Sequence, residues 1–125
     1  MIEKLAAQAP LALASGSERL VVEEVLEFSR LRKFFRAVVT GSDITRGKPD
    51  PQIFLQTAAL LGVAARDCWV IEDSKPGVAA ALAAGMRVVA ITNTHPAHEL
   101  GAATAVARTY AEIEQRLLPS GSPVS

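Results

Sequence analysis

Short apolar runs alternate along the chain with segments whose apolar residues recur at helical spacing. Continuous apolar runs are typical of buried strands, and a period near 3.6 residues is typical of amphipathic helices. The predicted strands are residues 11–14, 37–40, 68–71, 87–92 and, more weakly, 105–107. The predicted helices are residues 17–31, 51–61, 74–84 and 110–118. This alternation predicts an α/β fold with a parallel sheet flanked by helices on both faces.

Residues that start and stop helices agree with this assignment. Asp50 is suited to cap a helix that has Pro51 at its first position and Gly62 just past its end. Ser74 and Gly85 bracket a small Ala-rich helix in the same way. The order of elements is therefore marked by capping signals as well as by periodicity.

The composition favours one compact domain. The chain has 125 residues, of which 50% are hydrophobic and 21% charged. Thirteen basic and thirteen acidic side chains give no net charge, so no global field would attract nucleic acid or an anionic membrane. The single Cys68 excludes an internal disulfide, and no segment has a signal-peptide or transmembrane pattern. We expect a cytoplasmic location.

The two adjacent carboxylates Glu72 and Asp73 follow the apolar run of residues 68–71. In an open α/β sheet this position lies at the carboxyl edge, where ligands bind. The two charges repel each other, and a hard divalent cation such as Mg²⁺ would relieve that repulsion. The alternative is a solvated turn followed by the Ser74 helix cap.

Two further loops carry groups suited to phosphate. Ser15-Gly16-Ser17 ends a strand and opens a helix, where free N–H groups and the helix dipole favour an anion. Alternatively, Ser15 and Glu18 match a capping box that would occupy the Ser15 hydroxyl. Lys48 lies in a loop stiffened by two prolines, which limits how far its ammonium can wander. A hydroxyl, a fixed ammonium and an acid pair form most of a phosphoryl-transfer site.

Four segments of the chain resemble motifs of a known family. These segments are residues 13–17, residues 47–51 with Phe54, residues 70–74 with Gly77, and residues 83–86. They resemble the second, third and fourth motifs of the haloacid dehalogenase-like superfamily, in the branch of phosphoglycolate phosphatase and β-phosphoglucomutase. The resemblance covers roughly residues 11–92 and implies a Rossmann-like core.

The resemblance also implies a role for each matching residue. Ser15 and Lys48 would be the catalytic residues of this chain. The transferring phosphoryl group would be bound by Ser15, Gly16, Ser17 and Lys48. The resemblance thus implies that these two loops face a common phosphate.

For the metal, the resemblance implies that Asp73 binds Mg²⁺ directly. Glu72 would be a second ligand or would act on the metal through water. Asp43, in the loop after the predicted strand of residues 37–40, is a further candidate for the same edge.

One part of the family pattern is missing. The family nucleophile is the first Asp of an Asp-x-Asp motif on an N-terminal strand, and the second Asp is the general acid/base. The aspartates of this chain form no such pair; they are Asp43, Asp50, Asp67 and Asp73. The helical cap domain is also absent. The sequence therefore resembles the C-terminal half of a larger enzyme, and the chain alone is expected to be inactive.

The expected organisation follows from this partial match. Residues 1–10 would be a linker or the remnant of a cap helix, residues 11–118 a partial core, and residues 119–125 a loose tail. The missing strand is central in the family, between the strands that carry Ser15 and Glu72. Its absence would expose two strand edges or make them pair directly. We therefore expect marginal stability, self-association or a repacked sheet.

Two functions from different classes are consistent with these observations. The first is Mg²⁺-dependent phosphoryl transfer on a small phosphorylated metabolite, by a phosphatase or phosphomutase whose nucleophile comes from another segment. Its expected partners are that metabolite and either the missing N-terminal half or a second copy, with neither nucleic acid nor membrane. The second is a truncated, non-catalytic paralogue that acts as a phosphate- and Mg²⁺-binding or interaction module.

Overall fold

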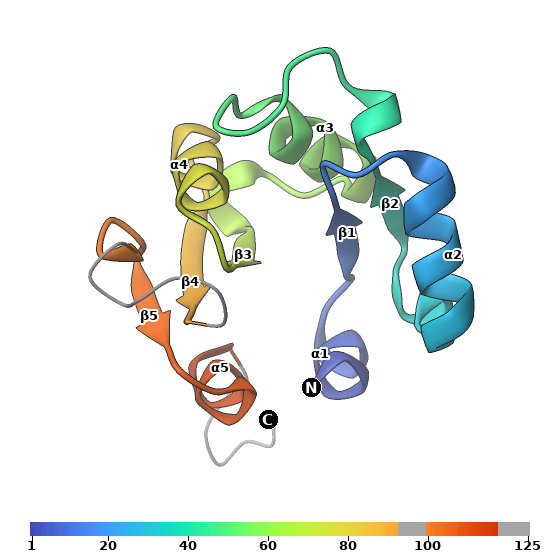
Figure 1. Ribbon diagram of the computed structural model, residues 1–125. Helices are drawn as coiled ribbons and strands as arrows, with labels where there is room; N and C mark the ends of the chain where they lie inside the picture. The colour runs from blue at the N-terminus through green and yellow to red at the C-terminus, as the bar shows by residue number, and fades with distance from the viewer. Residues whose placement is uncertain (93–99, 118–125) are drawn as a thin grey trace.

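The computed structural model describes residues 1–92 and 100–117 (Figure 1). The strands are β1 (Ala12–Ala14), β2 (Ala37–Val39), β3 (Trp69–Glu72), β4 (Arg87–Ile91) and β5 (Ala105–Ala107). The α-helices are α1 (Ile2–Gln8), α2 (Arg19–Ser29), α3 (Gln52–Leu61), α4 (Lys75–Ala83) and α5 (Tyr110–Leu117). The predicted α/β class is confirmed, and the predicted tail lies outside the described residues.

All observed strand pairs are parallel, as predicted. β1 pairs with β2, with Ala14 opposite Val39. β3 pairs with β4, which pairs in turn with β5. Glu72 is opposite Ala90 in the first of these pairs. Helix α2 lies between β1 and β2 in the chain, and α4 lies between β3 and β4, as crossovers between parallel strands require.

The strands form two sheets and not one continuous sheet. Among the described residues, β1 pairs with β2 alone and β3 with β4 alone. β1 and β3 line opposite sides of one cavity of about 460 Å³, to which Leu13 and Ile71 both contribute. Of the two expectations for the missing central strand, the structure therefore has exposed edges; the edges have not paired directly.

One apolar core spans both sheets. It contains Val39 of β2, Ile53 and Phe54 of α3, Val70 of β3 and Val78 of α4. Ile53 is fully buried. Helix α3 contacts β1, β2 and α4, and α4 contacts β3 and β4. Burial of these apolar faces holds the two half-sheets (β1–β2 and β3–β4–β5) in one body.

Most helix boundaries match the predicted signals. Gly62 ends α3 with a φ of 71°, and the hydroxyl of Ser74 accepts a hydrogen bond from the Gly77 N–H at 3.1 Å. The Asp50 carboxylate accepts from the Gln52 N–H at 2.9 Å, so α3 begins one residue later than predicted. Periodicity did not predict three short 3-10 helices: η1 (Arg32–Phe34), η2 (Gly41–Asp43) and η3 (Ala65–Asp67). Within the described residues, every helix is too short or too polar to cross a membrane.

Candidate functional site

The β1–α2 loop (residues 15–17) continues directly from β1. The Ser15 N–H donates to the Val39 carbonyl at 2.9 Å, which extends the sheet pairing by one residue. The Ser15 hydroxyl oxygen accepts from the Ser17 N–H at 3.2 Å. Helix α2 begins at Arg19, after Glu18, and has no side-chain cap bond. The alternative of a capping box between Ser15 and Glu18 is therefore wrong, and the Ser15 hydroxyl belongs to the loop at the end of β1.

Lys48 is fixed at the end of β3. Its Nζ lies 2.9 Å from Oε2 of Glu72, and the two side chains are 18% and 10% exposed. The same Nζ lies 5.1 Å from the centre of the Phe54 ring, within the range of a cation–π interaction. The two prolines predicted a fixed ammonium. In the structure this ammonium also contacts Glu72 of β3 and Phe54 of α3.

The Glu72 carboxylate uses both of its oxygens. Oε2 accepts from Lys48, while Oε1 accepts from the Asp73 N–H at 3.1 Å and from the Ser74 hydroxyl at 3.2 Å. Burial raises the pKa of this carboxyl, but the hydrogen bond and charge of Lys48, together with the interactions of Asp73, outweigh burial and hold the pKa below its ordinary value of 4.5. Glu72 is therefore ionised at neutral pH and acts in this structure as the partner of Lys48.

Gly77, in the first turn of α4, leaves room for the Glu72 side chain. A Cβ at position 77 would lie 2.0 Å from Cδ of Glu72 and 2.4 Å from its Oε2. A side chain at this position would push the carboxylate away from Lys48. The resemblance marked Gly77 as part of a motif, and its close approach to Glu72 gives the physical reason for glycine there.

Asp73 and Glu72 offer an oxygen donor set for a metal. Both side chains are partly buried at the C-terminal end of β3. The described residues contain no group of three or more His, Cys, Asp or Glu side chains that could hold an ion without other ligands. Mg²⁺ binds through one or two carboxylates and completes its shell with water and substrate phosphate. Asp73 fits that pattern as a direct ligand, and Glu72, whose oxygens accept from Lys48, the Asp73 N–H and Ser74, fits it through water.

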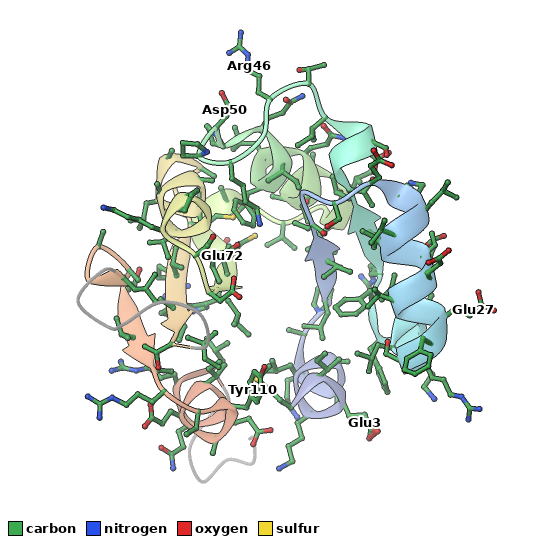
Figure 2. All side chains as sticks on the ribbon, viewed as in Figure 1. Glu3, Glu27, Arg46, Asp50, Glu72 and Tyr110 are labelled. Atoms are coloured by element: carbon green, nitrogen blue, oxygen red, sulfur yellow. The ribbon has the colours of Figure 1, made fainter. Side chains whose placement is uncertain are left out.

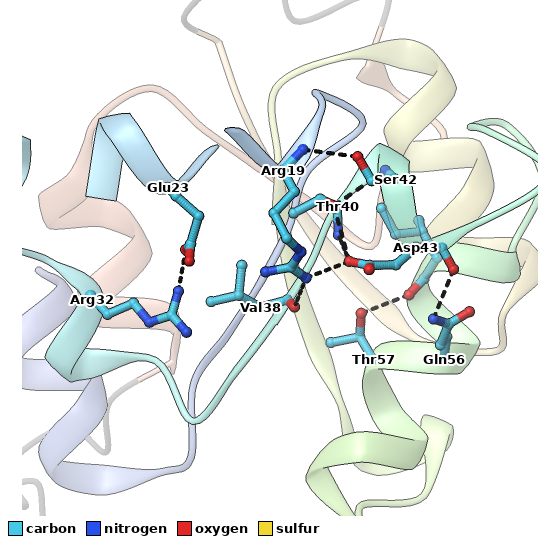
Figure 3. A network of polar contacts seen from close by, with 10 residues as sticks. Arg19, Glu23, Arg32, Val38, Thr40, Ser42, Asp43, Gln56 and Thr57 are labelled. Carbon is cyan, nitrogen blue, oxygen red and sulfur yellow. Dashed lines mark hydrogen bonds and ion pairs between the residues drawn. The ribbon is translucent and has the colours of Figure 1, made fainter. Parts of the chain in front are cut away.

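Asp43 has partners of its own, apart from the acid pair. Its Oδ2 lies 2.5 Å from Nη2 of Arg19 and accepts from the N–H and hydroxyl of Thr40 (Figure 3). The same arginine nitrogen donates to the Val38 carbonyl at 3.1 Å. Sequence reasoning missed Arg19, although the Thr40-x-x-Asp43 spacing is a capping-box pattern that could have indicated the role of Asp43.

Residues next to the predicted loops line one cavity. Its lining includes Ala14, which precedes Ser15, and also Phe54 and Glu72, which both contact Lys48. Figure 2 shows Glu72 toward the interior between the half-sheets, whereas Arg46 lies at the outer end of its loop. Of the predicted site residues that the structure describes, Glu72 lines this cavity itself, and Lys48 contacts its lining through Glu72 and Phe54.

Comparison with known proteins gives relatives that include a phosphatase and a phosphoglucomutase. A chloroplastic 5-amino-6-(5-phospho-D-ribitylamino)uracil phosphatase of Arabidopsis thaliana is 38% identical over 104 residues, which are 83% of this chain and 28% of that protein. The β-phosphoglucomutase of Bacillus subtilis is 37% identical over 99 residues, which are 79% of this chain and 42% of that protein. The chain thus spans less than half the length of these two relatives.

Solved structures agree with the sequence comparison. A putative β-phosphoglucomutase from Thermotoga maritima matches with a TM-score of 0.82 at 30% identity, over 94% of this chain and 57% of that chain. A family hydrolase from Deinococcus radiodurans, solved with bound phosphate and sodium, matches with a TM-score of 0.79 at 31% identity, over 94% of this chain and 55% of that chain. Residues 1–91 also match the family model for haloacid dehalogenase-like hydrolases. On this match of sequence and fold, the chain belongs to the haloacid dehalogenase-like hydrolase family.

Proposed function

We propose that this chain supplies the phosphate- and Mg²⁺-binding half of a phosphatase or phosphomutase that acts on a small phosphorylated metabolite. The observation that carries the proposal is the Lys48–Glu72 pair, 2.9 Å apart and little exposed, whose Glu72 lines the same cavity as β1. The relatives support it, since they include phosphatases and a phosphomutase. One structural relative was solved with phosphate bound.

Each group has a role that follows from its position. The Ser15 hydroxyl would donate to one phosphoryl oxygen from the end of β1. The Lys48 ammonium has three donors, so with one directed to Glu72 it keeps others for the phosphoryl group. Asp73, with Glu72, would hold Mg²⁺, which when bound neutralises developing charge on the phosphoryl oxygens. Positioning and charge neutralisation are the main contributions of such a site.

The nucleophile is the part that this chain lacks, because none of its aspartates forms an Asp-x-Asp pair. We propose that a strand from another segment enters the cavity between β1 and β3 and ends in an Asp-x-Asp pair. The open edges support this proposal, since unpaired strand edges are templates for an added strand. One inserted strand would join the two half-sheets into one sheet and bring its C-terminal carboxylates beside Lys48 and Asp73.

A non-catalytic binding module is the second candidate. It is favoured by the same missing pair. Both candidates share phosphate and Mg²⁺ binding and differ in whether turnover follows when a nucleophile strand is supplied.

The test is complementation of activity. The chain is co-expressed with the N-terminal portion of the B. subtilis β-phosphoglucomutase, and hydrolysis of an aryl phosphate with Mg²⁺ is measured. We expect turnover from the mixture and from neither part alone, with a loss of about 10²–10³-fold in kcat for Asp73→Asn. Glu27→Gln, an exposed acid on α2, serves as the control and should leave turnover unchanged. A folded complex without turnover would contradict the enzyme reading and leave the binding module.

A further inference from the structure

The 3-10 helix η2 lies directly beneath the β1–α2 loop. The Gly41 N–H donates to the Ser17 carbonyl at 2.8 Å, and the Arg19 N–H donates to the Ser42 hydroxyl at 3.0 Å. The two hydrogen bonds run in opposite directions between the segments, so each loop supports the other. Figure 3 shows Arg19 and Ser42 facing each other across this contact.

Gly41 makes the closest approach between the two segments. A Cβ at position 41 would lie 2.2 Å from the Gly16 carbonyl oxygen and 3.1 Å from that of Ser17. Both atoms are backbone, so they cannot yield as the end of a flexible side chain would. By contrast, a Cβ at Gly47 would meet nothing within 4 Å. The position of the β1–α2 loop is therefore tied to the absence of a side chain at residue 41.

Asp43 and Arg19 fix this contact laterally. Asp43 accepts from the Thr40 N–H at 2.8 Å and the Thr40 hydroxyl at 2.9 Å, and it pairs with Arg19 at 2.5 Å. The hydrogen bond from the Thr40 backbone, then those from Arg19 and the Thr40 hydroxyl, hold the pKa of Asp43 below its ordinary value. Thr40 is fully buried, so the carboxylate is anchored to the core. Arg19, the first residue of α2, is anchored through it.

We propose that Gly41, Asp43 and Arg19 are positioning residues for the β1–α2 loop. They hold the Ser15 hydroxyl and the loop N–H groups where a phosphoryl group binds, without touching that group themselves. The effect of these three residues on phosphate binding rests on the proposed function, whereas their effect on the placement of the loop does not. Arg19 and Asp43 are 38% and 31% exposed, and exposed ion pairs add little to global stability. Their loss should therefore alter the loop more than the fold.

The test uses ¹H–¹⁵N NMR of the full chain. Amide shifts and hydrogen exchange of Gly16 and Ser17 report the loop, and titration with inorganic phosphate in the presence of Mg²⁺ reports binding. Gly41→Ala and Asp43→Ala should shift both amides, speed their exchange and weaken phosphate binding by about tenfold or more, the loss typical of removing a supporting partner. Asp43→Asn keeps an oxygen acceptor and should restore part of the affinity.

Glu23→Gln is the matched control, because it removes the other arginine–carboxylate contact of α2, between Arg32 and Glu23. It should leave the Gly16 and Ser17 amides unchanged. Wild-type amide shifts and exchange in both Gly41→Ala and Asp43→Ala would overturn the inference. Should Gly41→Ala not fold, Asp43→Ala decides alone. If wild-type protein shows no response to phosphate, the proposed function fails, and the loop amides of the variants still decide the positioning role.

Discussion

Replacing Lys48 by methionine is expected to lower the free energy of unfolding by about 3 kcal/mol at pH 7, the lower end of the cost of leaving a buried charge without its partner. Methionine keeps the length and apolar stem of lysine, so packing changes little. The Glu72 side chain is only 10% exposed and would lose the ammonium at 2.9 Å. Denaturant unfolding measures the change.

The dependence of this cost on pH identifies its origin. The pKa of Glu72 lies below its ordinary 4.5 in the folded chain, so the stabilisation is fully present above 4.5 and is lost as the pH falls through the folded value. In Lys48→Met, burial without the ammonium raises this pKa and the carboxyl protonates more readily. The difference between wild type and variant should therefore be largest near neutral pH and shrink below about pH 4.5.

Lys4→Met is the matched control for this experiment. It removes a lysine–glutamate pair with Glu114 in which the lysine is 68% exposed. Pairs of this kind contribute about 0–1 kcal/mol. An equal cost for the two variants, or a cost for Lys48→Met that is the same at pH 3 and pH 7, would contradict the assigned role of the Lys48–Glu72 pair.

Replacing Gly77 by alanine is expected to destabilise the chain by about 1–3 kcal/mol, although alanine is the better helix former by about 1 kcal/mol. The reason is the 2.0 Å approach of the new Cβ to Cδ of Glu72. The carboxylate must move and lose its bonds to Lys48, to the Asp73 N–H and to Ser74. When the Gly77→Ala chain is co-expressed with the N-terminal portion of the β-phosphoglucomutase, turnover should fall together with stability, because Lys48 loses its partner Glu72.

A double-mutant cycle separates this clash from other effects of the substitution. In a Glu72→Ala background the obstructing side chain is gone, so Gly77→Ala should be neutral or stabilising there. Gly47→Ala, where a Cβ meets nothing within 4 Å, should have little effect in either background. Equal costs of Gly77→Ala with and without the Glu72 side chain would show that the clash lies elsewhere.

The sequence could predict what depends on local spacing. Gly62 and Ser74 mark helix ends through their own backbone and hydroxyl chemistry, and both act as predicted. Glu72 and Asp73 were placed at a sheet edge because an apolar strand precedes them. Two adjacent carboxylates do not reveal which one pairs with a distant lysine, however, and Lys48 is 24 residues away.

What the sequence could not predict depends on tertiary contacts. The role of Asp43 requires Arg19, which also lies 24 residues away and reaches it only because β1 and β2 are paired. Whether the edges of β1 and β3 stay open or pair directly also depends on tertiary packing. The shared core of α3 and α4 keeps both half-sheets attached and leaves the cavity between them open. Spacing along the chain does not show whether packing will reach this arrangement.

The central claim is that the loops after β1 and β3 and the Lys48 loop meet at one Mg²⁺–phosphate site. The most direct test replaces Mg²⁺ by paramagnetic Mn²⁺ in the presence of inorganic phosphate, with amide relaxation recorded by NMR. Because broadening falls steeply with distance, the account predicts that the amides of Asp73, Gly16 and Lys48 broaden together and that Asp73→Asn abolishes the effect at all three. Broadening at Asp73 without broadening at Gly16 and Lys48, or broadening that survives Asp73→Asn, would contradict it.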